Sequence, residues 1–121
     1  MKIGIIGFGA IGFDVAKKLD QEKDQFNVIG VHSRTKNKII DKTSSFNSPL
    51  RYFSLDEICK KSDVVIDCAP KEAFKEIIQK CLDYKTKLIT VSGAGILENQ
   101  EIINKAREYS TQIFLASGAI I

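Results

Sequence analysis

Short apolar stretches alternate with amphipathic stretches along the chain, a pattern typical of proteins in which strands and helices alternate. Strands are predicted where the residues are apolar and often β-branched: 2–6, 26–31, 50–53, 63–68, 87–92 and 112–116, of which 50–53 is the weakest. Parallel neighbours need a crossover connection, usually a helix. The order therefore predicts an α/β fold, a doubly wound and mostly parallel sheet of six strands with helices on both faces.

Helices are predicted between the strands, because apolar residues recur there at helical spacing. The clearest stripe is formed by Phe74, Ile77, Ile78, Cys81 and Leu82. A second stripe is formed by Ile11, Val15 and Leu19, with Lys17 and Lys18 expected to face water. A third is formed by Ile102, Ile103, Ala106 and Tyr109.

Two shorter helices are also predicted. Ser54 and Glu57 have the spacing of a capping box, which indicates that a helix begins after Ser54. Its inward side is expected to carry Leu55, Ile58 and Cys59. Residues 38–42, inside a polar and basic stretch, are the weakest candidate for a helix.

Size and composition indicate a single soluble domain spanning residues 1–121. The hydrophobic fraction is 44%, and the net charge of +3 is too small to indicate nucleic-acid binding. No apolar run approaches the roughly 20 residues that span a bilayer, and the N-terminus does not resemble a signal peptide. We therefore expect a cytoplasmic protein that binds neither membrane nor nucleic acid.

The cysteines and the single histidine do not indicate catalysis or metal binding. Cys59, Cys68 and Cys81 show no C-x-x-C spacing, and with His32 they do not compose a zinc site. Cys68 is interpreted as a structural thiol, because no positioned general base accompanies it. His32 lacks a paired carboxylate. We predict no metal site and assign no catalytic residue.

Residues 7–12 read G-x-G-x-x-G and stand between the first predicted strand and the first predicted helix. In a dinucleotide-binding fold, Gly7 would permit the tight turn, Gly9 the approach of the pyrophosphate, and Gly12 close packing of helix on strand. The start of the helix supplies N–H groups and a positive dipole end for the phosphates. The context favours a Rossmann-type dinucleotide-binding domain; the alternative is that the glycines serve only a tight turn.

The residues after the second predicted strand indicate which dinucleotide is preferred. An NAD site usually has an acidic residue there, which binds the ribose 2′-hydroxyl. This chain has Ser33 and Arg34 instead. Arg34 can bind a 2′-phosphate through charge-assisted hydrogen bonds, and Ser33 can donate another. NADP is therefore the predicted cofactor, with NAD as the alternative if the basic residues form only a solvated loop.

Further candidates follow from where the predicted strands end. In open α/β sheets, ligands lie beyond the carboxyl ends of the strands, near the point where the strand order reverses. The turns at that edge contain small residues that would let a flat cofactor approach the backbone. The candidates there are Cys68, Ala69, Pro70, Ser92, Gly93 and Ser117. The equal alternative is that these residues only end strands in tight turns.

The sequence resembles the N-terminal domain of L-aspartate dehydrogenases and, more distantly, the cofactor domain of homoserine dehydrogenases. The resemblance is carried by residues 2–12, 62–69, 88–95 and 114–120, the last ending in Ser-Gly-Ala-Ile. It implies an oxidoreductase that removes hydride and ammonia from L-aspartate with NAD or NADP. The product would be iminoaspartate, which hydrolyses to oxaloacetate or can feed NAD synthesis.

The resemblance also implies roles for individual residues. Gly9, Ala10 and Ile11 would meet the pyrophosphate, while Ser33 and Arg34 would meet the adenosine ribose. The nicotinamide half would lie along Ala69, Ser92, Gly93 and Ser117. The family usually has an acidic residue after the second strand and a proline before the final Ser-Gly-Ala, where this chain has Ser33-Arg34 and Ala116.

Length distinguishes this chain from the proteins it resembles. They continue into a second domain, which binds substrate, carries the catalytic histidine and forms a dimer interface. One interpretation is that this chain is the cofactor domain of a longer, homodimeric amino-acid dehydrogenase, with the substrate domain absent from it. The apolar end Ala119-Ile120-Ile121 favours that interpretation. The other is a stand-alone, non-catalytic dinucleotide-binding or sensing module that acts through a protein partner.

Overall fold

The computed structural model describes residues 1–22, 24–34, 46, 50–109 and 111–116. Parallel strands form one five-stranded sheet in the order β2-β1-β3-β4-β5. They are β1 (Lys2–Ile6), β2 (Asn27–His32), β3 (Val64–Asp67), β4 (Lys87–Thr90) and β5 (Ile113–Leu115). The helices are α1 (Ala10–Gln21), α3 (Leu55–Lys61), the 3₁₀ helix η2 (Lys71–Ala73), α4 (Phe74–Tyr84), α5 (Gly93–Glu98) and α6 (Gln100–Glu108). None of the helices in this described part is long and apolar enough to cross a membrane.

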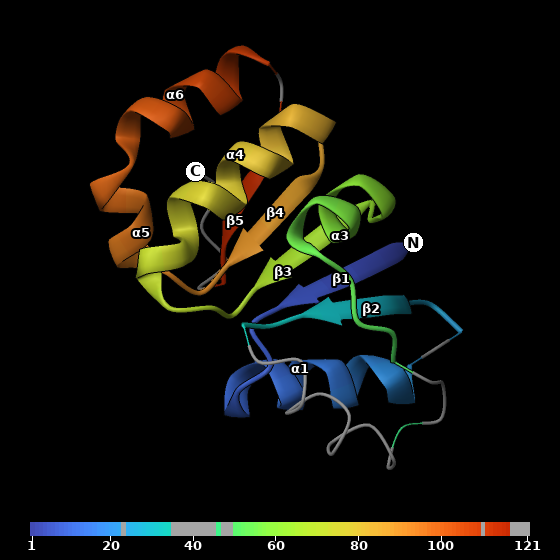
Figure 1. Ribbon diagram of the computed structural model, residues 1–121. Helices are drawn as coiled ribbons and strands as arrows, with labels where there is room; N and C mark the ends of the chain where they lie inside the picture. Colours follow the sequence, from blue (N-terminus) through green and yellow to red (C-terminus); the bar gives the residue numbers. More distant parts are fainter. Residues whose placement is uncertain (23, 35–45, 47–49, 110, 117–121) are drawn as a thin grey trace.

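Helices cover both faces of the sheet, which confirms the predicted doubly wound α/β fold (Figure 1). Successive side chains of a strand point to opposite faces. Ile3 and Ile5 of β1 therefore pack toward α1, in a cluster with Ala16. Ile6 points to the other face, into a larger cluster that includes residues of α3, α4 and α6.

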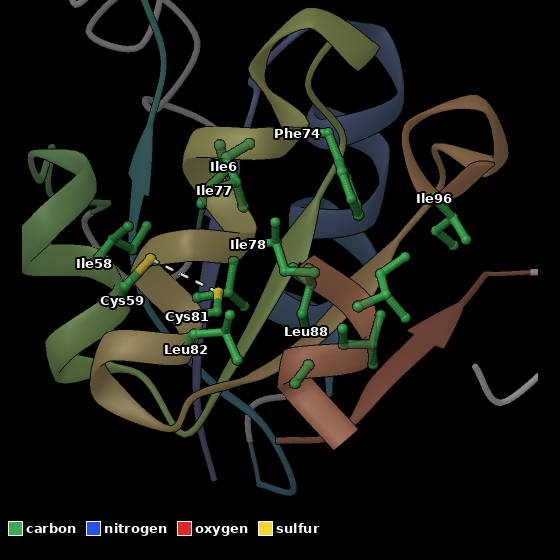
Figure 2. Close-up of a cluster of buried hydrophobic side chains, with 14 of the residues drawn as sticks. Ile6, Ile58, Cys59, Phe74, Ile77, Ile78, Cys81, Leu82, Leu88 and Ile96 are labelled. Carbon is green, nitrogen blue, oxygen red and sulfur yellow. Dashed lines mark hydrogen bonds between the residues drawn. The ribbon is translucent and has the colours of Figure 1, made fainter. Parts of the chain in front are cut away.

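The larger cluster holds the apolar stripe predicted for α4 (Figure 2). All five residues of that stripe are buried: Phe74, Ile77, Ile78, Cys81 and Leu82. They pack against Leu88 of β4 and against Ile58 and Cys59 of α3. The i, i+3, i+4, i+7, i+8 spacing therefore predicted both the helix and its buried face.

The predicted capping box at the start of α3 is also present. Ser54 Oγ accepts a hydrogen bond from the backbone N–H of Glu57 at 3.1 Å, and Glu57 Oε1 accepts one from the backbone N–H of Ser54 at 3.2 Å. The hydrogen bonds from Ser54 lower the pKa of the Glu57 carboxyl. Reciprocal capping thus fixes where α3 begins.

The predicted strand at residues 50–53 is wrong, so the sheet has five strands rather than six. This segment makes a single parallel bridge, between Tyr52 and Val31. Val31 N donates to Arg51 O at 2.8 Å, and Phe53 N donates to Val31 O at 2.9 Å. The segment follows the edge of β2 for one residue and then turns into α3, so no ladder forms.

The stripe predicted for α1 is buried only in part: Val15 and Leu19 are partly buried and pack against the cluster on that face of the sheet, but Ile11 does not. Ile11 of α1 is 58% exposed, and the buried edge of this helix is formed by Gly12, Ala16 and Asp20. Lys17, expected in water, is partly buried with its Nζ 5.0 Å from the centre of the Phe46 ring. Small residues let α1 lie close to the sheet, and this turns Ile11 outward.

Tyr109 is 60% exposed, because α6 ends at Glu108 and the predicted stripe does not extend past the helix. Ile103 and Ala106 are buried as predicted. The short helix predicted at residues 38–42 lies outside the described residues.

Candidate functional site

A cleft of about 700 Å³ opens where β1, β2 and β3 end. Ile6 is in register with His32 of β2 and with Asp67 of β3, so the three strands end side by side (Figure 1). The loops that follow all reach the cleft. The predicted site residues that line it are Gly7, Gly9, Ser33, Arg34, Cys68, Ala69 and Pro70. The volume lies in the range of small-molecule sites.

The glycine loop between β1 and α1 has the geometry expected for its first and third glycines. Gly7 has φ +84°, a conformation that favours glycine. A Cβ on Gly12 would overlap the carbonyl oxygen of Gly7, so only glycine allows α1 to approach the turn this closely. A Cβ on Gly9 would meet no atom within 4 Å, because this residue faces open space.

The start of α1 has the electrostatics of an anion site. Gly9 is the N-cap residue, and no side chain accepts a hydrogen bond from the N–H groups at the start of the helix. The first turn contains no acidic residue. The first N–H groups of a helix have no intrahelical acceptor and lie at the positive end of the dipole. Ala10 and Ile11 are exposed beside the cleft without lining it, and Gly12 is buried beneath them.

The exit of β2 is held by the segment 51–53. His32 Nδ1 lies 2.8 Å from Phe53 O, and because a carbonyl only accepts, Nδ1 carries the proton and donates. The Tyr52 ring lies 5.7 Å from the His32 ring, and the Tyr52 hydroxyl donates to Ser33 O at 3.3 Å. These contacts hold His32 and Ser33, the two residues that precede Arg34. The Arg34 side chain is exposed and lines the cleft.

The cleft lining also includes residues that the sequence pattern did not predict. They are Leu55 at the start of α3 and a group around the start of α4, namely Glu72, Ala73, Glu76 and Ile77. Glu72 of η2 and Glu76 of α4 are four residues apart, and both line the cleft. The sequence signal that could have identified these two glutamates is their position shortly after Pro70, in the loop and helix that follow a predicted strand. The cleft lining thus contains two acidic residues as well as Arg34.

Asp67 is the buried carboxylate beneath the cleft, with an exposed fraction of 1%. Its Oδ1 accepts from the backbone N–H of Ala69 at 2.9 Å, and its Oδ2 accepts from the hydroxyl of Thr90 at 2.8 Å. Burial raises the pKa of the Asp67 carboxyl, while these two hydrogen bonds oppose the rise. The sequence pattern predicts Asp67 within a strand and indicates no role for it.

Asp67 makes stability depend on pH in a direction that can be tested. Because its pKa is raised, the folded chain retains a proton that the unfolded chain has lost, so the free energy of unfolding falls as pH rises above about 3.8. We expect Asp67→Asn to remove this contribution, so that the variant's free energy of unfolding, relative to wild type, increases with pH. Urea denaturation from pH 4 to pH 8 measures the difference; parallel curves for the two proteins would contradict it.

Cys68 lines the cleft as a partly buried thiol. Burial, followed by the nearby Asp67 carboxylate, raises the pKa of the Cys68 thiol to about 11. At neutral pH the group is therefore a thiol and not the thiolate that a nucleophile requires. This agrees with the interpretation of Cys68 as a structural residue.

Ser92 and Gly93 are not in the cleft lining. Ser92 is the N-cap of α5, where its Oγ accepts from the N–H of Gly95 at 2.9 Å, and Gly93 is the first residue of that helix. Ser117 lies outside the described residues. Within the described part of the chain, no group of three or more His, Cys, Asp or Glu residues could hold a metal ion.

Known structures share this fold. UDP-N-acetylglucosamine 3-dehydrogenase GnnA from Acidithiobacillus ferrooxidans superposes with a TM-score of 0.79 at 18% identity, covering 95% of this chain and 37% of that one. A dehydrogenase (MviM) from Clostridium difficile superposes with a TM-score of 0.79 at 19% identity, covering 96% of this chain and 39% of that one. At these identities the likeness establishes the fold alone.

Proteins that are similar in sequence indicate the family of this chain more specifically than the similar structures do. An L-aspartate dehydrogenase of Methanococcoides burtonii is 28% identical over 93 residues, which are 76% of this chain and 34% of the relative. L-aspartate dehydrogenase 3 of Bordetella bronchiseptica is 29% identical over 100 residues, 82% of this chain and 37% of the relative. The chain spans about a third of the length of these curated relatives. The family "homoserine dehydrogenase, NAD binding domain" matches residues 7–116, nearly the whole chain, and the chain therefore belongs to that family of dehydrogenase NAD-binding domains.

Proposed function

We propose that the cleft binds NADP and that residues 1–121 form the dinucleotide-binding domain of a dehydrogenase. The observation that carries the proposal is the meeting of the glycine loop, Arg34 and the loop at residues 68–70 in one cleft. The open space at Gly9 fits the approach of a pyrophosphate, and the start of α1 fits its charge. When bound, the dinucleotide would supply hydride transfer.

The preference for NADP over NAD rests on the exit of β2. Arg34 is exposed at the cleft wall where an NAD site places a carboxylate, and Ser33 lies beside it. We expect calorimetric titration of the chain to give a lower dissociation constant for NADP than for NAD. A lower value for NAD would contradict the preference, and binding of neither would contradict the proposed function.

The reaction that we propose is the oxidative deamination of L-aspartate to iminoaspartate, performed by a protein of which this chain is the cofactor domain. The support is that the relatives above are L-aspartate dehydrogenases, at low identity and over about a third of their length. The test is to assay the protein that contains this domain for the reduction of NADP by L-aspartate, with L-homoserine as the comparison substrate. A preference for L-homoserine would exclude aspartate as the substrate, and no reduction with either would favour a non-catalytic module.

A further inference from the structure

A buried series of hydrogen bonds joins the loops that follow β3 and β4. Thr90 is fully buried, and its hydroxyl donates to Asp67 Oδ2 at 2.8 Å. The same hydroxyl oxygen accepts from the backbone N–H of Ser92 at 3.0 Å. Asp67 Oδ1 accepts from the backbone N–H of Ala69 at 2.9 Å. One hydroxyl and one carboxylate therefore hold both loops.

The Ala69 end of this series touches the glycine loop. A Cβ on Gly7 would lie 2.6 Å from Ala69 N and 2.7 Å from the carbonyl carbon of Cys68, so the two backbones are in close contact. The Cys68 N–H also donates to Ile6 O at 2.8 Å, immediately before Gly7. Because the two backbones are in contact, a displacement of Ala69 changes the packing against Gly7.

Asp67 acts on the cleft only through its neighbours. It is buried and does not line the cleft, so it cannot touch a bound ligand. A buried carboxylate is costly unless hydrogen bonds compensate it, and Thr90 supplies the only side-chain donor to Asp67 among the described residues. Removing the Thr90 hydroxyl leaves the carboxylate with its backbone donor alone, and that donor, Ala69, lines the cleft.

We propose that Thr90 is a positioning residue for the cleft. Its hydroxyl orients the Asp67 carboxylate, which holds the turn at Cys68 and Ala69 against Gly7 and so sets the shape of the glycine loop. The inference rests on the proposed function, since its effect on affinity requires that this cleft bind a dinucleotide. It adds a residue on β4, outside the cleft lining, to those that determine affinity.

The test compares Thr90→Val, which keeps the shape and removes the hydroxyl, with Thr90→Ser, which keeps the hydroxyl. The matched control is Thr86→Val, because Thr86 is also buried and donates its hydroxyl to Cys59 O, but stands just before β4, at the end opposite Thr90. The readouts are the dissociation constant of NADP by calorimetry and the hydrogen exchange of the Ala69 and Gly7 amides in the free protein.

We expect Thr90→Val to raise the NADP dissociation constant about tenfold, and Thr90→Ser and Thr86→Val to change it by less than about twofold. In the free protein, Thr90→Val should speed exchange at Ala69 and Gly7, whereas Thr86→Val should not. The inference is overturned if Thr90→Val binds NADP like wild type, if Thr86→Val weakens binding equally, or if exchange at Ala69 is unchanged. If wild type binds no dinucleotide, the proposed function fails, while the exchange rates still decide whether Thr90 holds the loop.

Discussion

Replacing Gly12 with alanine is expected to lower the free energy of unfolding by about 3 kcal/mol. The added Cβ would overlap the carbonyl oxygen of Gly7, and this is a backbone atom that cannot rotate away as a side chain can. The first turn of α1 must therefore withdraw from β1, which disturbs the packing of Ala16 against the sheet. Urea denaturation followed by circular dichroism measures the loss, which is a large part of the stability of a small domain.

Gly9→Ala is the matched control, because it adds the same methyl group three residues earlier. That Cβ would meet no atom within 4 Å, and φ of −78° suits alanine. We expect stability within about 0.5 kcal/mol of wild type. The methyl group would occupy the proposed approach of the pyrophosphate, so NADP affinity should fall at least about tenfold. Equal losses of stability in the two variants would contradict the distinct roles assigned to these glycines.

Local patterns in the sequence were sufficient for much of the fold. The stripe from Phe74 to Leu82 and the capping box at Ser54 involve residues within one or two turns of each other, so spacing alone identifies them. The strand predicted at residues 50–53 failed because a strand exists only when a neighbour pairs along its length. Here the neighbour is Val31 alone.

Ile11 shows why an apolar residue at helical spacing can still face solvent. In α1 the close approach to the sheet is made by Gly12 and Ala16, and the helix rotates to bury these small residues. Hydrophobic spacing alone therefore predicts the packing of Val15 and Leu19 but not the exposure of Ile11. The glycine motif does predict which side of α1 is buried, because its third glycine, Gly12, packs against the turn at Gly7.

The candidate site was predictable where residues adjoin the ends of strands. Gly7, Arg34 and Ala69 line the cleft because parallel strands end at the same edge of the sheet. The partnership of Asp67 and Thr90 was not predictable, because they are 23 residues apart and meet only once β3 and β4 pair in register. The signal present was a carboxylate at the end of an apolar strand, where a buried charge requires a partner.

Replacing Arg34 with alanine is expected to raise the dissociation constant of NADP about thirtyfold while leaving that of NAD within about twofold. The guanidinium can donate two parallel hydrogen bonds to a phosphate, and NAD has no 2′-phosphate to receive them. Arg34 is exposed in the free chain, so its removal leaves the packing of the domain unchanged. Parallel calorimetric titrations with the two dinucleotides measure the ratio directly.

Two further variants separate recognition from general charge. Arg51 is exposed and does not line the cleft, and its carbonyl, which accepts from Val31 N, is retained in alanine. Arg51→Ala removes one positive charge outside the cleft lining and should leave both dissociation constants within about twofold, because salt screens an exposed charge that does not contact the ligand. Arg34→Lys keeps the charge but loses the planar fork, so its NADP affinity should fall between those of wild type and Arg34→Ala. If Arg51→Ala and Arg34→Ala weaken NADP binding equally, the basic residues act only as a diffuse field, and the assignment of the 2′-phosphate to Arg34 is wrong.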